Sequence, residues 1–244
     1  TNHTSVHLTH FGLLQNPFPV APDDANFYLS DTIEEIITEI VHGITARKGF
    51  IMLTGDVGLG KTTITRRILR ILESKEVHTS LVFHTSLKDV DLLREINRDF
   101  GLPVDGASDS AQLGDQLQQL NDFLVAQYGQ GKNCAIIIDD AQNLDRDSLE
   151  LVRMISNLEV DQQKIVQILL VGQTELMTTL TSRAMRQLYS RIVIRKVVRS
   201  LSQAELRSYV QFKLNTAGNQ GRITLTPFAY WRLYRLSKGN FRSL

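Results

Sequence analysis

The segment from Gly55 to Thr62 constrains the fold of this chain more than any other stretch of the sequence. It reads Gly-Asp-Val-Gly-Leu-Gly-Lys-Thr and satisfies every fixed position of the pattern G-x-x-x-x-G-K-[ST]. An apolar run at 50–53 precedes it, and apolar side chains recur at helical spacing from Ile64 to Leu72 behind it. A buried strand, a glycine-rich loop and a helix in this order predict a phosphate-binding loop (P-loop).

This loop predicts which residues hold a nucleotide and its metal. The glycines let backbone N–H groups turn toward phosphate oxygens, and the following helix adds the positive end of its dipole. Lys61 is expected to neutralise phosphate charge, and the Thr62 hydroxyl is expected to ligate Mg²⁺. The residues expected to bind the cofactor, ATP, are Gly55, Asp56, Val57, Gly58, Leu59, Gly60, Lys61, Thr62 and Thr63.

A second apolar segment ends in two consecutive acids. Residues 134–138 are all apolar, and Asp139 and Asp140 follow them. Parallel α/β folds bind ligands at the carboxyl ends of their strands, so Asp139 is expected to hold Mg²⁺ opposite Thr62. Asp140 is expected to orient the attacking water. A strand-end cap for Asp139 and a solvated turn for Asp140 are the alternatives.

The remaining apolar patterns predict a parallel α/β sheet. Further strands are expected at 80–84, 165–171 and 192–198, and further helices at 31–45, 89–100, 112–128 and 148–158. Asp31 is expected to be the N-cap of the first of these helices. Five strands separated by helices indicate a doubly wound sheet with right-handed crossovers. Gln173 closes the strand at 165–171, where a polar side chain can sense the γ-phosphate or form a turn.

From Ser202 onward only helical patterns remain. Ser202 and Glu205 form a capping box, and Thr226 with Pro227 begins a second helix. Trp231, Tyr209 and Tyr234 are expected to form the core of this small helical lid. The predicted organisation is an N-terminal arm at 1–30, an α/β nucleotide-binding core at 31–200 and a helical lid at 201–244, truncated at its C-terminal end.

The arm carries two features of its own. His3, His7 and His10 lack a carboxylate or cysteine nearby, so they predict no metal site. The aromatic and proline residues before the first helix are expected either to wall the nucleotide base or to brace the fold; they are Phe11, Pro17, Phe18, Pro19, Pro22, Phe27 and Tyr28.

Composition limits the protein class and its location. Of the 244 residues, 42% are hydrophobic and 22% charged, as in ordinary globular proteins. The single cysteine, Cys134, excludes an intrachain disulfide and favours a reduced core thiol in the cytoplasm. The sequence has no signal-peptide pattern and no apolar run of about 18 residues. Because the chain lacks an initial Met and ends at Leu244 in mid-pattern, we expect a longer protein, located at the cytoplasmic face of a membrane if its flanks contain an anchor.

Charge is unevenly distributed although the net charge is only +1. The segment 183–199 has no acidic residue and six basic ones: Arg183, Arg186, Arg191, Arg195, Lys196 and Arg199. Contact with duplex DNA and contact with a neighbouring subunit's nucleotide and acids are both compatible with this cluster.

Taken in order, these motifs resemble an AAA+ ATPase. More narrowly, the chain is similar to the ExeA/GspA-type ATPases of general secretion and pilus assembly, with overlap to TniB/TnsC-type regulators of transposition. Besides the P-loop, the resemblance rests on Phe11-Gly12-Leu13, Asn16-Pro17-Phe18, Asp139-Asp140-Ala141-Gln142, Gly172-Gln173-Thr174-Glu175-Leu176, Gln187-x-x-Ser190-Arg191-Ile192 and Ser237-Lys238-Gly239-Asn240-Phe241-Arg242.

The resemblance assigns roles to further residues. It implies Asp140 as the catalytic acid, Gln173 as the first sensor and Arg242 as the second sensor, carried by the lid. Arg191 is implied to be a finger donated to a neighbour's γ-phosphate, with Arg195 as its substitute. The chain departs from the family twice. Asp140 is one methylene shorter than the usual Glu, which predicts slow hydrolysis, and Phe241 replaces a frequent Pro, which leaves the register of Arg242 open.

These roles imply assembly with nucleotide. If Arg191 acts in trans, ATP is expected to promote a ring or helical homo-oligomer that hydrolysis relaxes. Three functions follow: an ATPase acting on a secretion or pilus assembly partner, an ATP-dependent DNA-binding regulator of transposition, and a slowly hydrolysing, nucleotide-gated scaffold.

Overall fold

The central element is a five-stranded parallel sheet. The computed structural model describes residues 8, 10–18, 28–83, 88–104, 111–219 and 221–243. The strands run in the order β2-β3-β6-β1-β7, with every neighbouring pair parallel. Their bounds are Phe50–Gly55 for β1, His78–Val82 for β2, Cys134–Ile138 for β3, Gln167–Gly172 for β6 and Ile192–Val198 for β7. The α/β class predicted from the sequence is confirmed.

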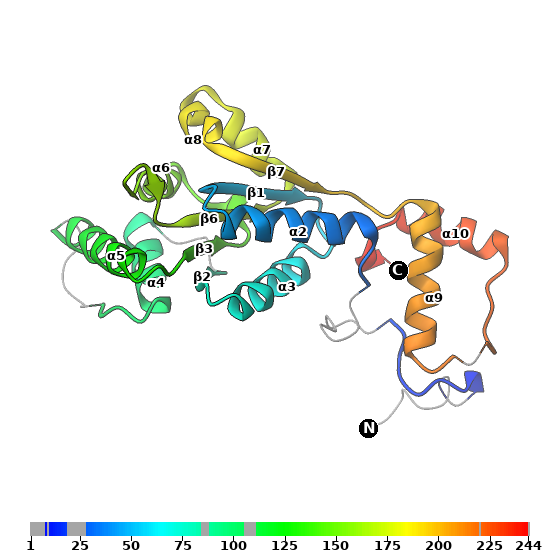
Figure 1. Cartoon of the computed structure of the whole chain (residues 1–244). Coiled ribbons are helices and arrows are strands. Elements are labelled where there is room, and N and C mark those ends of the chain that lie inside the picture. The colour runs from blue at the N-terminus through cyan, green and yellow to red at the C-terminus, as the bar shows by residue number, and fades with distance from the viewer. Residues whose placement is uncertain are drawn as a thin grey trace.

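Helices cover both faces of this sheet because its strands are apolar on both sides. On one face, α2 (Asp31–Thr45) and α3 (Lys61–Ser74) pack against Ile51 and Leu53 of β1. On the other face lie α4 (Asp89–Asp99), α5 (Ala111–Gly129), α6 (Arg146–Ile155), α7 (Thr174–Thr181) and α8 (Arg186–Ser190). Phe50 and Met52 point to that second face, as the two-residue period of a strand requires. Figure 1 shows both helical layers.

The C-terminal helices form a separate small cluster. Helices α9 (Gln203–Thr216) and α10 (Pro227–Ser237) enclose apolar side chains that include Leu206, Tyr209 and Tyr230. A short 3-10 helix, η3 (Phe241–Ser243), follows. In Figure 1 this lid lies beyond the carboxyl end of β7, away from α4, α5 and α6. Within the described residues, no helix is both long and apolar enough to cross a bilayer.

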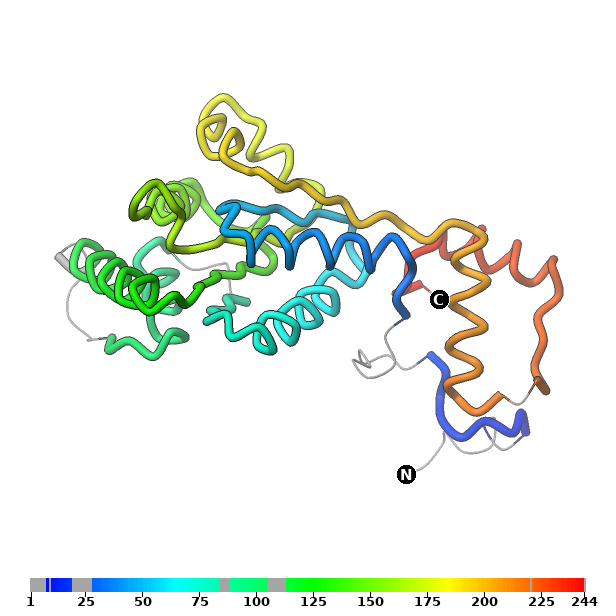
Figure 2. Tube along the Cα trace, in the orientation of Figure 1, coloured from blue at the N-terminus to red at the C-terminus, as the bar shows by residue number. Residues whose placement is uncertain are grey.

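The described part of the N-terminal arm packs on the lid. The backbone N–H of Leu14 donates to the carbonyl oxygen of Ala217 over 2.8 Å, and Phe18 and Tyr28 contact the ring of Tyr209. Figure 2 shows this segment beside one end of α9. These contacts indicate that the described aromatic residues of the arm brace the fold rather than form a wall for the nucleotide base. His3, His7, Pro19, Pro22 and Phe27 lie outside the described residues.

Several local predictions were wrong. The N-cap of α2 is Ser30, whose side chain accepts a hydrogen bond from the N–H of Ile33, and Asp31 is the first helical residue. Trp231 is 44% exposed and stacks on Phe228 outside the lid core, where Tyr230 is buried instead. Strand β2 lies two residues earlier than expected.

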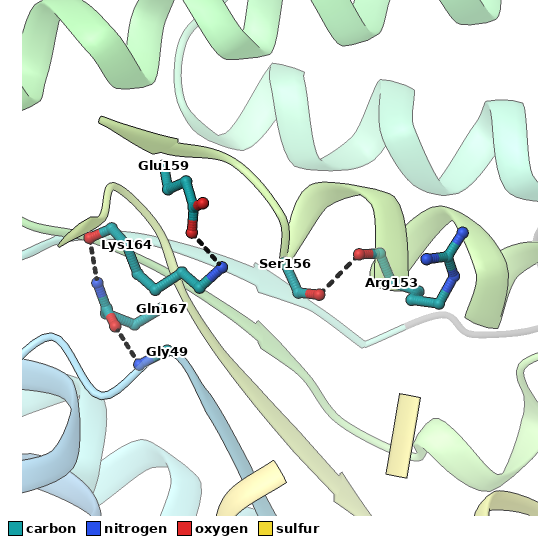
Figure 3. A network of polar contacts seen from close by, with 6 residues as sticks. All are labelled: Gly49, Arg153, Ser156, Glu159, Lys164 and Gln167. Carbon is teal, nitrogen blue, oxygen red and sulfur yellow. Dashed lines mark hydrogen bonds and ion pairs between the residues drawn. The ribbon is translucent and has the colours of Figure 1, made fainter. Parts of the chain in front are cut away.

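A small hairpin and a polar network at the amino end of the sheet were not predicted. Strands β4 (Glu159–Val160) and β5 (Gln163–Lys164) precede β6. The buried Gln167 accepts from the N–H of Gly49 over 2.7 Å and donates to the carbonyl oxygen of Lys164, whose ammonium pairs with Glu159 (Figure 3). The network therefore joins the hairpin to the start of β1.

We predict that Gly239→Ala destabilises the protein by about 1–3 kcal/mol more than Gly221→Ala does. Both glycines have positive φ, 75° and 80°, so the backbone strain is similar. A Cβ at Gly239 would lie 2.1 Å from the carbonyl oxygen of Leu201, whereas a Cβ at Gly221 would meet nothing within 4 Å. Denaturant unfolding of both variants measures the difference, and equal losses would contradict the steric explanation.

Candidate functional site

The glycine-rich loop lies at the carboxyl end of β1, an interior strand between β6 and β7. Gly55 leaves no room for a side chain, because a Cβ there would lie 2.7 Å from the carbonyl oxygen of Val198. Gly58 and Gly60 have φ values of 81° and 79°, which favour glycine. Gly60 is also the N-cap of α3 and makes no side-chain cap. The first N–H groups of α3 are therefore directed into the loop, as an anion site requires.

Lys61 is held inside this loop. It is only 8% exposed, and its Nζ donates to the carbonyl oxygens of Gly55 over 2.7 Å and Asp56 over 2.9 Å. Burial lowers the pKa of Lys61, while the nearby acids, above all Asp139 and Asp140, raise it. The loop thus presents a preoriented ammonium group surrounded by carboxylates.

Asp139 and Thr62 meet at the same point. Asp139 is 2% exposed and burial raises its pKa, while hydrogen bonds from the backbone N–H of Asp140 and from the Thr62 side chain lower it. The Asp140 N–H lies 2.9 Å from Asp139 Oδ1. A hydroxyl and a carboxylate side by side are the oxygen donors that Mg²⁺ uses, so the two residues predicted as metal ligands fit this ion.

Asp140 follows in a left-handed conformation, with φ 52° and ψ 35°, which aspartate adopts more readily than most residues. Its Oδ1 accepts from Gln142 Nε2 over 3.1 Å. Gln142 lies in the 3-10 helix η1 (Ala141–Asn143), and its Oε1 accepts from the backbone N–H of Gln173 over 2.9 Å. The expected acid and the expected first sensor are therefore joined through Gln142.

The corner between β6 and α7 also contacts the P-loop. Gln173 is the N-cap residue of α7, and the next residue, Thr174, donates its hydroxyl to Asp56 Oδ1 over 2.6 Å. This bond connects the sensor position with the first variable residue of the loop.

The lid also contacts the P-loop. Asn240 Nδ2 donates to the carbonyl oxygen of Val57 over 2.7 Å, and Asn240 Oδ1 accepts from the N–H of Arg242 over 2.9 Å. A Cβ at Gly58 would lie 2.8 Å from the Cβ of Arg242. The Cβ of Arg242 therefore lies against the P-loop, while the residue as a whole is exposed.

Arg191 lies at the other end of the sheet. It immediately precedes β7, whose first residue, Ile192, pairs with Phe50, whereas Val198 pairs with Gly55 at the P-loop end. A six-residue strand separates the two ends, about 20 Å. Among the described residues, the Arg191 side chain has no hydrogen bond or ion pair. Arg195 packs 4.1 Å from the centre of the Tyr189 ring and donates to the Tyr189 carbonyl oxygen.

Sequence reasoning missed Gln142, Thr174 and Asn240 as residues of the site. All three belong to the segments that carry the resemblance, yet nothing in their spacing says what they bind. The available signal was their position, because each lies within three residues of an expected site residue.

We predict that Asp139→Asn stabilises the ligand-free protein by about 1 kcal/mol, although it removes a predicted metal ligand. Since the folded-state pKa is raised, the stabilising contribution of this carboxyl is present at low pH and is lost as pH rises through that pKa. The gain should therefore be largest near about pH 8 and shrink toward about pH 4. Thermal unfolding in EDTA measures it, with the exposed turn variant Asp161→Asn as control; a gain that grows toward low pH would contradict the assignment.

Sequence comparisons match this chain to known proteins. The family described as an AAA domain matches residues 44–180. General secretion pathway protein A of Aeromonas hydrophila is 37% identical over 234 residues, which cover 96% of this chain and 42% of that protein. The chain thus spans less than half of this relative.

Solved structures are similar in fold. They include the Aeropyrum pernix ORC1 protein in complex with DNA, with a TM-score of 0.66, 18% identity and coverage of 94% of this chain and 61% of that chain. The Walker-type ATPase PABY2304 of Pyrococcus abyssi has a TM-score of 0.60, 14% identity and coverage of 93% and 69%. At these identities the likeness concerns the fold alone.

Proposed function

Because the chain belongs to the AAA domain family, as the order of its motifs predicted, we propose that it binds ATP with Mg²⁺ and hydrolyses it to ADP and phosphate. One observation carries the proposal: the buried Lys61, bonded inside the P-loop, lies among acids that include Asp139, and Asp139 bonds to Thr62. The ammonium group complements the negative charge of a nucleoside triphosphate, and the carboxylate and hydroxyl oxygens complement its metal ion.

Each residue has a proposed task. ATP supplies a γ-phosphoryl group whose transfer to water needs charge neutralisation and an oriented nucleophile. Lys61 and the loop N–H groups, from Gly55 to Thr63, bind the phosphates, and Thr62 and Asp139 hold the metal. Asp140 orients the water, while Gln173 and Arg242 contact the terminal phosphate from the sheet and from the lid.

Arg191 is the proposed reason for assembly. Because it lies at the end of the sheet opposite the P-loop of its own chain, it serves a neighbour's site more readily than its own. We therefore include an ATP-dependent ring or helical homo-oligomer in the proposal. The arm at 1–30, the core at 31–200 and the lid at 201–244 are its proposed units. The lid changes position with the bound nucleotide, because Asn240 bonds to the P-loop.

The proposed partner is a component of secretion or pilus assembly, on the strength of the similarity to General secretion pathway protein A. A cytoplasmic site of action, at the membrane face if flanking segments anchor the protein, belongs to the same proposal. The free, buried Cys134 supports a reducing compartment.

Binding of duplex DNA, as in the transposition regulators, is the second candidate. It rests on Arg183, Arg186 and Arg199, which are exposed in the basic segment, whereas Lys196 of that segment pairs with Glu39. The third candidate, a slowly hydrolysing scaffold, rests on the short acid Asp140.

One set of measurements separates the three. Phosphate release with Mg²⁺ and ATP tests hydrolysis, and electron microscopy with ATP or ADP, with and without duplex DNA at several salt concentrations, tests assembly. Turnover with DNA-independent assembly supports the secretion ATPase. Assembly that needs DNA and weakens with salt supports the second candidate, and a large gain of turnover in Asp140→Glu supports the third. Absence of ATP binding would overturn all of them.

A further inference from the structure

We propose that Gln142 is a positioning residue of the ATPase reaction, which holds the Asp140 carboxylate in register with the corner between β6 and α7. The inference rests on the hydrolysis proposed above and names a residue to which the motif resemblance gave no role. It is carried by two hydrogen bonds of one amide group, whose NH₂ donates to Asp140 Oδ1 and whose oxygen accepts from the backbone N–H of Gln173.

The orientation of the Gln142 amide is determined by its partners. The backbone N–H of Gln173 can only donate, so the amide atom facing it, at 2.9 Å, is the oxygen. The NH₂ group therefore faces Asp140 Oδ1, at 3.1 Å. Reversing the amide would place a donor against a donor and an oxygen against a carboxylate, so both bonds favour the same orientation.

Close packing restricts Gln142 further. A Cβ at Gly172 would lie 3.1 Å from Gln142 Oε1 and 3.3 Å from the Gln142 backbone nitrogen, so the absence of a side chain at Gly172 gives the amide its place against β6. Gln142 is itself half-buried. Its amide is therefore fixed by packing as well as by hydrogen bonds.

This arrangement gives the Asp140 carboxylate a defined orientation. Gln142 Nε2 donates to Oδ1 and so restricts the plane of the carboxylate that is proposed to orient the attacking water. Gln142 also accepts a hydrogen bond from the backbone N–H of Gln173. A shift of the corner between β6 and α7 would therefore move the Asp140 carboxylate as well. The same corner bonds to Asp56 through Thr174, so the P-loop, the sensor and the acid form one connected unit.

Two variants test the two bonds separately. Gln142→Met keeps the length of the side chain and loses both bonds. Gln142→Glu can still accept from the Gln173 N–H, but it loses the donor to Asp140. We expect both to lower kcat for ATP about 10- to 100-fold with KM within about 3-fold, because a displaced reacting group affects the chemical step rather than binding. The exposed neighbour Asn143→Ala is the control and should match the natural protein.

A double-mutant cycle distinguishes positioning from a general structural role. In an Asp140→Asn background, Gln142→Met should lower kcat by less than about 3-fold, since both changes remove the same contribution. Full turnover in Gln142→Glu, or an undiminished effect of Gln142→Met in the double variant, would overturn the inference while leaving the ATPase proposal intact. No hydrolysis by the natural protein would overturn both.

Discussion

Replacing Lys61 by Ala should weaken binding of Mg-ATP by about 100-fold or more, the largest effect on nucleotide affinity expected of any single change in this chain. The ammonium group is buried and held by the carbonyl oxygens of Gly55 and Asp56, so it is oriented before ligand binds. Charge-assisted hydrogen bonds to phosphate oxygens contribute about 1.5–3 kcal/mol each, and one ammonium can make more than one. Isothermal titration calorimetry of the two proteins measures the difference.

Lys48→Ala is the matched control, because Lys48 is an exposed lysine just before the amino end of the same strand, β1. It should bind Mg-ATP like the natural protein. Burial lowers the pKa of Lys61, which means that the fold disfavours its charge, so Lys61→Ala is expected to remain folded by thermal unfolding. A folded Lys61→Ala variant with unchanged affinity would remove the basis of the nucleotide site.

The sheet was predictable because its strands obey simple local rules. The runs 50–53 and 134–138 are apolar throughout, and the run 165–171 is apolar except for Gln167, as expected of strands covered on both faces. The glycines at 55–60 mark a loop by their backbone freedom. The capping box at Ser202 and Glu205 was predictable for the same reason, since both partners lie within one helical turn.

The failures of prediction have physical causes. Ser30 and Asp31 are both good N-caps, and only the backbone of residue 30, with φ −77° and ψ 156°, decides between them. Trp231 lies on a helix with apolar residues on several faces, so the sequence alone does not identify the face that meets α9.

The candidate site likewise has a part that was predictable from the sequence and a part that was not. Lys61, Thr62 and Asp139 follow from strand ends and loop spacing. The bonds of Gln142 to Gln173, Thr174 to Asp56 and Asn240 to Val57 join residues that are 31, 118 and 183 positions apart. Such contacts depend on the packing of the sheet and the lid, which no local pattern encodes.

Arg191→Ala should lower kcat for ATP by about 10³-fold and leave ATP affinity within about 3-fold, because an arginine finger stabilises charge only in the transition state. Arg195→Ala serves as the control on the same segment. The Arg195 guanidinium packs on Tyr189 and bonds to its carbonyl oxygen, so its removal should cost much less turnover. A loss in Arg195→Ala equal to that in Arg191→Ala would contradict the assignment of the finger.

Mixing two inactive variants then tests whether the finger acts across subunits. A Lys61→Ala chain lacks its own phosphate site but keeps Arg191, and an Arg191→Ala chain keeps its site but lacks the finger. In a head-to-tail assembly of equal amounts, about a quarter of the junctions combine an intact site with an intact finger, so roughly that fraction of natural turnover should return. If Arg191 served its own chain, no junction would be complete and the mixture would stay inactive. The position of Arg191 at the amino end of the sheet, one strand length from its own P-loop, favours recovery.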